Sequence, residues 1–148
     1  MKRRCPTLTI FLALAALPAC HKDKSASPTA GAAGSHVQGT PHTDEVMSAW
    51  RNAGLAPDGF APVRPAPNGA AYCEHGLVRG VDATLCEYAS DDALKRGTQQ
   101  VKEGWARTDV HTGVVLSAKR TTMVAVDRAR REPSGKTIGQ MAKIFSKL

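Results

Sequence analysis

The sequence is poor in aromatic residues, and this limits the core that it can build. Two tryptophans, two tyrosines and three phenylalanines make up 5% of its 148 residues. Large rings supply much of the apolar area that a small domain buries. We therefore expect a light core, in which a covalent cross-link would contribute to stability. No dominant internal repeat is present.

The sequence also lacks an apolar run that would cross a bilayer. Residues 8–17 (LTIFLALAAL) are apolar apart from one threonine. This run is shorter than the about 20 residues that a spanning helix needs. It follows the basic start Met1-Lys2-Arg3-Arg4, and this order is typical of a signal peptide. We therefore assign residues 1–19 to a signal peptide that is removed.

Motifs for nucleotide binding and nucleophilic catalysis are missing as well. No serine lies in a nucleophile-elbow pattern, and no two carboxylates have a spacing typical of acid–base catalysis. Gly135-Lys136-Thr137 is similar to the end of a phosphate-binding loop, but Arg130 stands where that loop needs a glycine. The sequence therefore predicts no enzyme, no bound nucleotide and no cofactor.

A histidine base and a small metal site remain as alternatives. The candidates for a general base and its partner are His75, His111, Asp82 and Asp109. Cys73, His75 and Cys86 are a possible ligand set for a metal, or the core of a small enzymatic site. A solvated surface histidine and a disulfide are the simpler interpretations of the same residues.

A cysteine follows the apolar run after two residues. Leu17-Pro18-Ala19-Cys20, after the basic start and the apolar residues, resembles the lipobox of bacterial lipoproteins. The resemblance covers residues 1–20 and implies cleavage before Cys20, diacylation of its thiol and acylation of the new amino group. Two or more acyl chains anchor a protein stably to a membrane. The alternative is an ordinary secretory signal cut near residues 13–15, which would leave Cys20 as a spare thiol.

Acylation of Cys20 would place the protein in the bacterial cell envelope. The next residue is His21 rather than the aspartate that retains some lipoproteins in the inner membrane, so we expect the outer membrane. Removing residues 1–19 takes away three basic residues and Cys5, and lowers the net charge from +7 to about +4. Cys73 and Cys86 then remain as one pair in an oxidising compartment.

Residues 21–42 consist mostly of serine, alanine, glycine, proline and threonine. Such a segment buries too little apolar surface to offset its ordering entropy. We therefore expect residues 20–42 to form the lipidated cysteine and a disordered tether, with a typical end-to-end distance of roughly 25 Å. A single folded domain should follow over residues 43–148.

Residues 71–89 (AYCEHGLVRGVDATLCEYA) predict a β-hairpin with its turn at Arg79-Gly80. Counting outward from a two-residue turn places Cys73 opposite Cys86, on a non-hydrogen-bonded pair. The Cα atoms of such a pair lie about 4.5 Å apart, within the range of a disulfide. The register and the cysteine spacing therefore support each other. A disulfide closing so short a loop would contribute roughly 2–3 kcal/mol.

The other elements follow from periodicity and capping. We expect helices over 43–53, from Ser90 to Trp105, and from Pro133-Ser134 to the end, and a second hairpin over 110–128. The proline-rich stretch 55–69 should be an irregular crossing. The order α-ββ-α-ββ-α predicts an α+β two-layer sandwich: an antiparallel sheet of about four strands with helices on one face.

The two halves of the domain differ in charge. Residues 43–94 carry eight acidic and three basic residues, whereas residues 95–148 carry four acidic and twelve basic ones. The densest basic patch is Arg128, Arg130 and Arg131, which could contact an anionic membrane surface or an acidic envelope protein. A solvated basic face is the simpler alternative, and nucleic acid is a poor candidate outside the cell.

We therefore expect a non-catalytic binding or accessory module that is anchored to a membrane lipid and has an unknown envelope partner. An inhibitor of an envelope enzyme is a further alternative. The residues that carry these expectations are Cys20 for the anchor, Cys73 and Cys86 for the disulfide, and Arg128, Arg130 and Arg131 for the partner.

Overall fold

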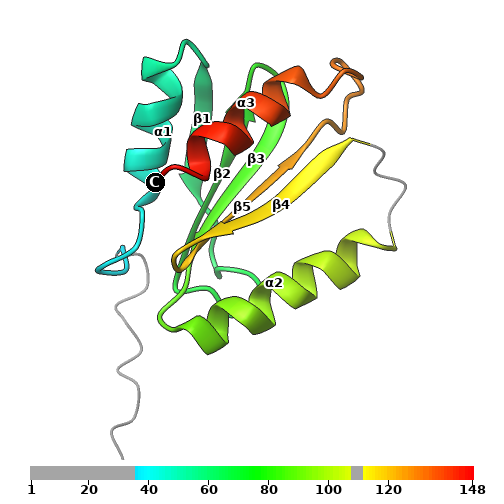
Figure 1. Ribbon diagram of the computed structural model, residues 1–148. Coiled ribbons are helices and arrows are strands. Elements are labelled where there is room, and N and C mark those ends of the chain that lie inside the picture. Colours follow the sequence, from blue (N-terminus) through cyan, green and yellow to red (C-terminus); the bar gives the residue numbers. More distant parts are fainter. Residues whose placement is uncertain (1–35, 108–111) are drawn as a thin grey trace, which may run out of the picture.

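The computed structural model describes residues 36–107 and 112–148, which form an antiparallel sheet and three helices (Figure 1). In chain order the elements are α1 (Thr43–Asn52), β1 (Pro57–Pro62), β2 (Tyr72–Val78), β3 (Val81–Glu87), α2 (Asp91–Trp105), β4 (Gly113–Ala118), β5 (Thr121–Val126) and α3 (Lys136–Phe145). The strands lie in the order β1-β2-β3-β5-β4. The predicted α+β fold is therefore confirmed, with β1 as an additional strand. Within the described ranges, no helix has the length and apolar character that a membrane span requires.

The β2–β3 hairpin has the predicted register. Val78 pairs with Val81 across the turn, and Cys73 pairs with Cys86. Arg79 and Gly80 both have positive φ angles, 51° and 84°, as in the tight turns whose twist matches that of a hairpin. Cys73 and Cys86 form a disulfide with a Cα–Cα distance of 4.1 Å. The predicted disulfide is thus confirmed.

β1 lies in the stretch that we expected to be irregular. Pro57 and Pro62 stand at its two ends, where a strand at the sheet edge tolerates the loss of a backbone donor. The pairing of β1 with β2 shifts register between Asp58 and Ala61, so Gly59 and Phe60 form a bulge. The ring of Phe60 lies so close to Gly76 that a Cβ there would be 2.4 Å from it. Tertiary packing therefore makes a strand where local propensity predicts none.

The main core lies between one face of the sheet and the helices α1 and α3. Trp50 of α1, Met141 and Phe145 of α3, and Leu85 and Met123 of the central strands are all fully buried in one cluster. The indole Nε1–H of Trp50 donates to the backbone oxygen of Met141, at 3.3 Å. The core needs few aromatic rings because methionine and leucine side chains fill the space around Trp50.

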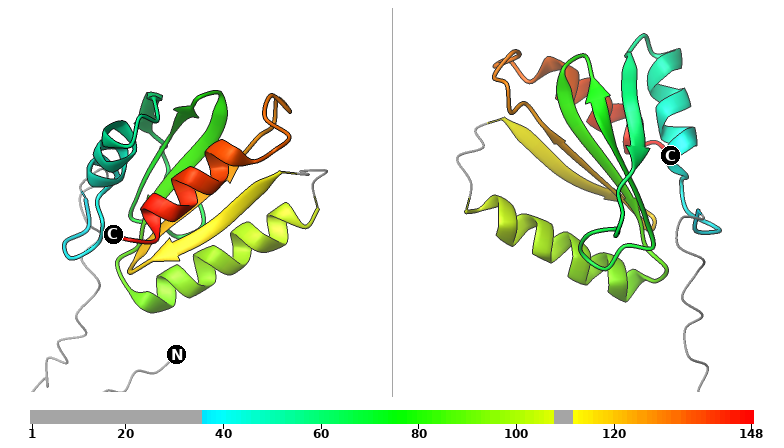
Figure 2. Two further views of the ribbon diagram at one scale, coloured as in Figure 1. Left: turned by 45° about the horizontal axis from the view of Figure 1, so that its top comes forward. Right: turned by 180° about the vertical axis from the view of Figure 1, so that it is seen from behind.

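α2 packs against the opposite face of the sheet. The hydroxyl of Thr98 in α2 lies 3.4 Å from the hydroxyls of Ser117 and Thr122. These two residues lie on the sheet face that also carries the disulfide. Figure 2 shows α2 running alongside β4, and residues 63–70 cover the part of the same face that holds the disulfide. The helices α1 and α3 thus share one face as expected, and α2 lies on the other. The spacing of apolar residues in the sequence shows which side of α2 is apolar, but not which face of the sheet the helix covers.

Two glycines of α2 allow the closeness of this packing to be tested. A Cβ on Gly97 would lie 2.4 Å from the ring of Tyr88, whereas a Cβ on Gly104 would meet nothing within 4 Å. We expect Gly97→Ala to lower the free energy of unfolding by about 2 kcal/mol because the helix must move off the sheet. Gly104→Ala should raise it by about 0.5–1 kcal/mol because alanine loses less entropy in a helix.

Urea unfolding followed by circular dichroism measures both variants. Equal effects of the two substitutions would contradict the close contact between α2 and Tyr88.

Candidate functional site

The basic patch lies on the loop between β5 and α3, and this loop is shaped by a buried carboxylate. Asp127 is 5% exposed and accepts the backbone N–H groups of Arg131, at 3.0 Å, and Glu132, at 2.7 Å. The chain therefore wraps around Asp127. The side chains of Arg128, Arg130 and Arg131 are all exposed.

The second acidic residue of the loop is directed at α3. The carboxylate of Glu132 accepts the backbone N–H of Thr137, with distances of 2.9 and 2.8 Å to its two oxygens. A negative charge at this place is favoured by the unpaired N–H groups of a helix N-terminus. Both loop carboxylates thus bind backbone groups, while the guanidinium groups face solvent. Gly135-Lys136-Thr137, which is similar to the end of a phosphate-binding loop, is thus the start of α3, with a backbone N–H bound by the carboxylate of Glu132.

A fourth arginine joins this surface from another hairpin. Arg79, in the turn between β2 and β3, is exposed and donates to the backbone oxygen of Gly54. A Cβ on the neighbouring Gly80 would lie 3.5 Å from Cδ of Arg131, so the two loops are in contact. We call the surface formed by Arg79, Arg128, Arg130 and Arg131 the basic end. Sequence analysis missed Arg79 because it lies far from the other three in the chain.

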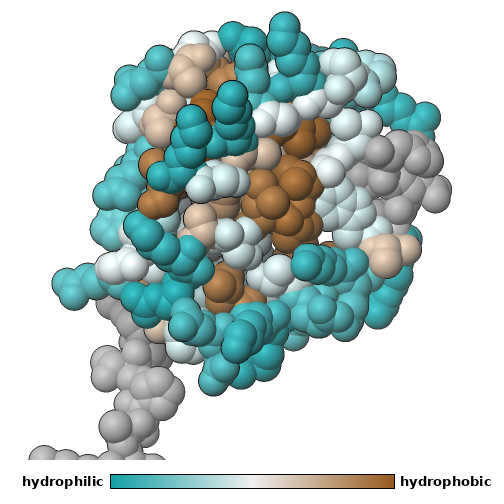
Figure 3. All heavy atoms as spheres, viewed as in Figure 1, coloured by the Kyte–Doolittle hydropathy of each residue, from teal (hydrophilic) through white to brown (hydrophobic). Residues whose placement is uncertain are grey.

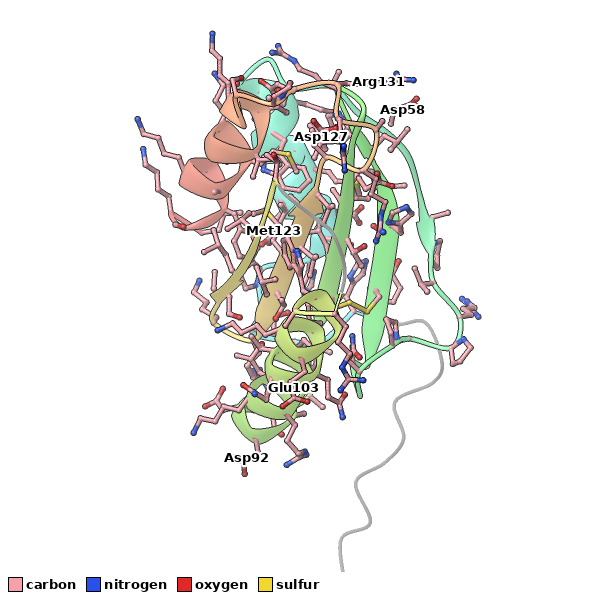
Figure 4. All side chains as sticks on the ribbon, turned by 90° about the vertical axis from the view of Figure 1, so that its right-hand side faces the viewer. Asp58, Asp92, Glu103, Met123, Asp127 and Arg131 are labelled. Carbon is pink, nitrogen blue, oxygen red and sulfur yellow. A yellow bond between two sulfur atoms is a disulfide. The ribbon has the colours of Figure 1, made fainter. Side chains whose placement is uncertain are left out.

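The described chain enters the domain at the opposite end of the sheet. The hydroxyl of Thr121, at the start of β5, donates to the backbone oxygen of Pro41 at 2.7 Å, whereas the basic end follows Val126 at the other end of the same strand. Figure 4 shows Arg131, Asp127 and Asp58 together at one end, and Asp92 and Glu103 of α2 toward the other.

Residues 36–42, which we had assigned to the tether, are held against the sheet by Glu87. This side chain is fully buried at the end of β3. Its carboxylate accepts the backbone N–H groups of Val37, at 2.7 Å, and Thr43, at 3.1 Å, and lies 2.7 Å from Nδ1 of His36. The charge of Glu87 thus connects the entering segment, the start of α1 and a central strand. Composition alone could not reveal this contact because it depends on one distant residue.

His36 and Tyr72 form a polar layer over this carboxylate. Burial lowers the pKa of His36, but the hydrogen bond to Glu87 and the charges of Glu87, Asp44 and Glu74 outweigh it and raise the pKa above 6.5. The ring of His36 stacks on that of His42, with a centroid distance of 4.8 Å. Burial, and then the hydrogen bond that Tyr72 donates to Glu74 at 2.6 Å, raise the pKa of the Tyr72 phenol. This cluster attaches the entering chain.

His75 and Asp82, two of the residues considered as an alternative base and partner, form a surface contact. Nδ1 of His75 lies 3.0 Å from Oγ1 of Thr84, and its Nε2 lies 3.7 Å from Oδ1 of Asp82. The His75 side chain is 47% exposed. Such a cross-strand group on an open sheet face resembles a structural pairing more than the water-excluded sites in which acid–base catalysis operates. The other candidates, His111 and Asp109, lie outside the described residues.

The two cysteines of the alternative metal site are bonded to each other. Cys73 and Cys86 pack with Tyr88 under the N-terminal part of α2 and the loop of residues 63–70. Among the residues that the structure describes, no group of three or more histidine, cysteine, aspartate or glutamate side chains is arranged to hold a metal ion. Cys20 and the rest of the lipobox resemblance lie outside the described residues.

No family model, no curated protein and no solved structure matches this chain. The candidate site is therefore defined by geometry and charge alone: a basic end at one pole of the sheet and a chain entry at the other.

The raised pKa of His36 predicts how the entry cluster responds to pH. Protonated His36 binds Glu87, so its stabilisation is complete below pH 6.5, the ordinary pKa, and is lost as the pH rises through the higher folded-state value. We expect His36→Ala to lower the free energy of unfolding by about 1 kcal/mol at about pH 5.5, and by clearly less at about pH 8.5.

Urea titrations at the two pH values test this expectation, with His75→Ala as the control for loss of an exposed histidine. If the loss of unfolding free energy in His36→Ala is constant or grows with pH, the stabilising contact between protonated His36 and Glu87 is contradicted.

Proposed function

We propose that this protein is a lipoprotein of the bacterial cell envelope, anchored through acylated Cys20, and that its folded part is a non-catalytic module that binds an acidic partner protein through the basic end. The observation that carries the proposal is the separation between chain entry and basic end. Any anchor on the N-terminal side connects through residue 36, and the exposed arginines lie at the other pole of the sheet.

Distances along the chain support this arrangement. The six residues of β5 span about 17 Å, and residues 20–35 can reach at most roughly 50 Å. The basic end is displaced from the attachment point by the length of the sheet. When the entry end faces an anchoring leaflet, the basic end is directed away from its lipids and is accessible to a partner protein.

The chemistry of the basic end also favours carboxylates. Guanidinium groups bind carboxylates with two parallel hydrogen bonds, and arginine is enriched where proteins recognise each other. Four exposed arginines from two loops offer several such contacts over one surface. The two loop carboxylates do not compete because Asp127 and Glu132 accept backbone N–H groups.

Acylation is tested by the intact mass of the protein purified from envelope membranes. We expect a mature chain that begins at Cys20 and carries a diacylglycerol group and an amide-linked acyl chain. Cys20→Ser should yield a chain without these groups. A wild-type protein that keeps residues 1–19, or that begins elsewhere with an unmodified Cys20, would contradict the anchor.

The basic end is tested by photo-crosslinking in envelope fractions, with a benzophenone side chain in place of Ala129, an exposed residue between Arg128 and Arg130. We expect Arg128→Ser/Arg130→Ser/Arg131→Ser to reduce the crosslinked protein adduct about tenfold. The matched control is Lys95→Ser/Arg96→Ser/Lys102→Ser on α2, which removes the same charge from another exposed surface. The wild-type adduct should also weaken as NaCl rises from about 50 mM to about 500 mM.

Two results would overturn the assignment of the basic end. One is an equal loss of adduct in both triple variants, since this would indicate a general charge effect. The other is strong wild-type binding to phosphatidylglycerol vesicles that the arginine variant loses, since this would make a lipid surface the ligand.

A further inference from the structure

β4 is an edge strand of the sheet. Among the residues that the structure describes, it is hydrogen bonded to β5 on one side and to no strand on the other. β1 forms the opposite edge. An edge presents a row of unpaired backbone N–H and C=O groups that can pair with another extended chain.

The two edges differ in how they are protected. β1 has Pro57 and Pro62 at its ends and a bulge at Gly59, three features that hinder the addition of a strand. β4 (GVVLSA) has no proline and no charged residue, and its six residues pair with β5 in one unbroken register. The fold thus blocks one edge and leaves the other regular.

The ladder shows which backbone groups of β4 face outward. Ala118 and Thr121 close the two-residue turn and form a hydrogen-bonded pair. The alternation then directs the N–H and C=O groups of Gly113, Val115 and Ser117 away from β5. The backbone bond from Asp127 to Thr112 confirms this phase, since Thr112 is the next inward-facing residue.

Apolar side chains accompany this open edge. Val114 and Leu116 are only partly buried and pack against the main core, as do Ala142 and Ile144 of α3. In Figure 3, hydrophobic atoms are exposed at the centre of the face, between hydrophilic bands, where Figure 1 places β4 between α3 and α2. A strand added to β4 would cover part of this surface.

The charge around β4 indicates what kind of strand would fit. α3 contributes Lys136 and Lys143 and no acidic residue, and Lys119 lies in the turn at the end of β4. The charges of α2, on the other side of β4, balance, with three acidic residues (Asp91, Asp92, Glu103) and three basic ones (Lys95, Arg96, Lys102). The basic end adjoins the other end of β4, since Val126 pairs with Gly113 just before the loop of arginines. A second copy paired on β4 would bring like charges together, whereas an acidic segment would be attracted.

We propose that β4 takes an extended acidic segment of a partner protein as an additional antiparallel or parallel strand, which binds the outward backbone groups of Gly113, Val115 and Ser117. Main-chain hydrogen bonds supply the affinity in this mode, and the basic rim selects for acidic side chains. The inference rests on the proposed function for the acidic character of the partner, whereas the strand addition rests on β4 itself.

The probe is a synthetic acetylated peptide in which glutamate and valine alternate, with a lysine–valine peptide as its counterpart. Amide hydrogen exchange of the mature protein is followed by NMR at saturating peptide. We expect the exchange of the Val115 and Ser117 amides to slow by about tenfold with the glutamate peptide. The amide of Leu116, which already faces β5, should change little. The lysine peptide should have no effect.

A pair of substitutions separates the backbone from the side chain. Val115→Pro removes an outward-facing N–H without removing a backbone donor to β5, and should weaken binding of the glutamate peptide by about tenfold. Val115→Ala removes the side chain but keeps that N–H, and should bind within about threefold of the wild type. Ser117→Pro serves as a second test at the next outward position should Val115→Pro fail to fold.

Any outcome other than selective protection by the glutamate peptide overturns the proposal. Equal protection by both peptides removes the preference for acid. Protection that rises with protein concentration in the absence of peptide makes a second copy the occupant, and protection at every concentration makes it this chain's own N-terminal segment. These results are independent of the arginine experiment, so the proposed function and this inference can fail separately.

Discussion

The structure depends on the burial of one carboxylate. Glu87 is fully inaccessible at the end of a central strand, where an unpaired charge would cost several kcal/mol. Two backbone N–H groups and the ring of His36 surround it instead. Because these donors come from the entering segment and from the start of α1, the charge can be buried only when the helix, the entry and β3 are all in place. The contact therefore links the entering segment, the start of α1 and the end of β3 at one point.

At both ends of the sheet, carboxylates accept backbone N–H groups, but the two ends differ in what they expose. At the entry pole, Glu87 draws the preceding chain inward and binds it. At the other pole, Asp127 and Glu132 also bind backbone N–H groups, but the loop they organise presents its arginines to solvent. In both places the acidic residues support the backbone. The acidic residues of the loop are thus directed at the backbone, and its exposed side-chain hydrogen-bond donors are the arginines.

Local patterns in the sequence predicted the parts of the fold that depend on near neighbours. The β2–β3 register followed from the turn at Arg79-Gly80 and the cysteine spacing, and Ser90 caps α2 as expected, with its Oγ accepting the N–H of Ala93. β1 was missed because its prolines argue against a strand unless an edge position is known. The face on which α2 packs depends on a contact between Gly97 and Tyr88 that no periodicity reveals. The same limit applies to the candidate site, since Arg128, Arg130 and Arg131 are visible as a run but Arg79 is not.

The attachment of the entering segment also determines how the domain would carry mechanical force. The guanidinium of Arg120 donates to the backbone oxygens of Gln38 and Ala89, close to where Glu87 holds Val37. A pull through residue 36 is therefore passed to β3 and β5 in the middle of the sheet before it reaches α1. Traction on the N-terminal side would be shared by several hydrogen bonds in parallel, so the first helix would not be unwound turn by turn.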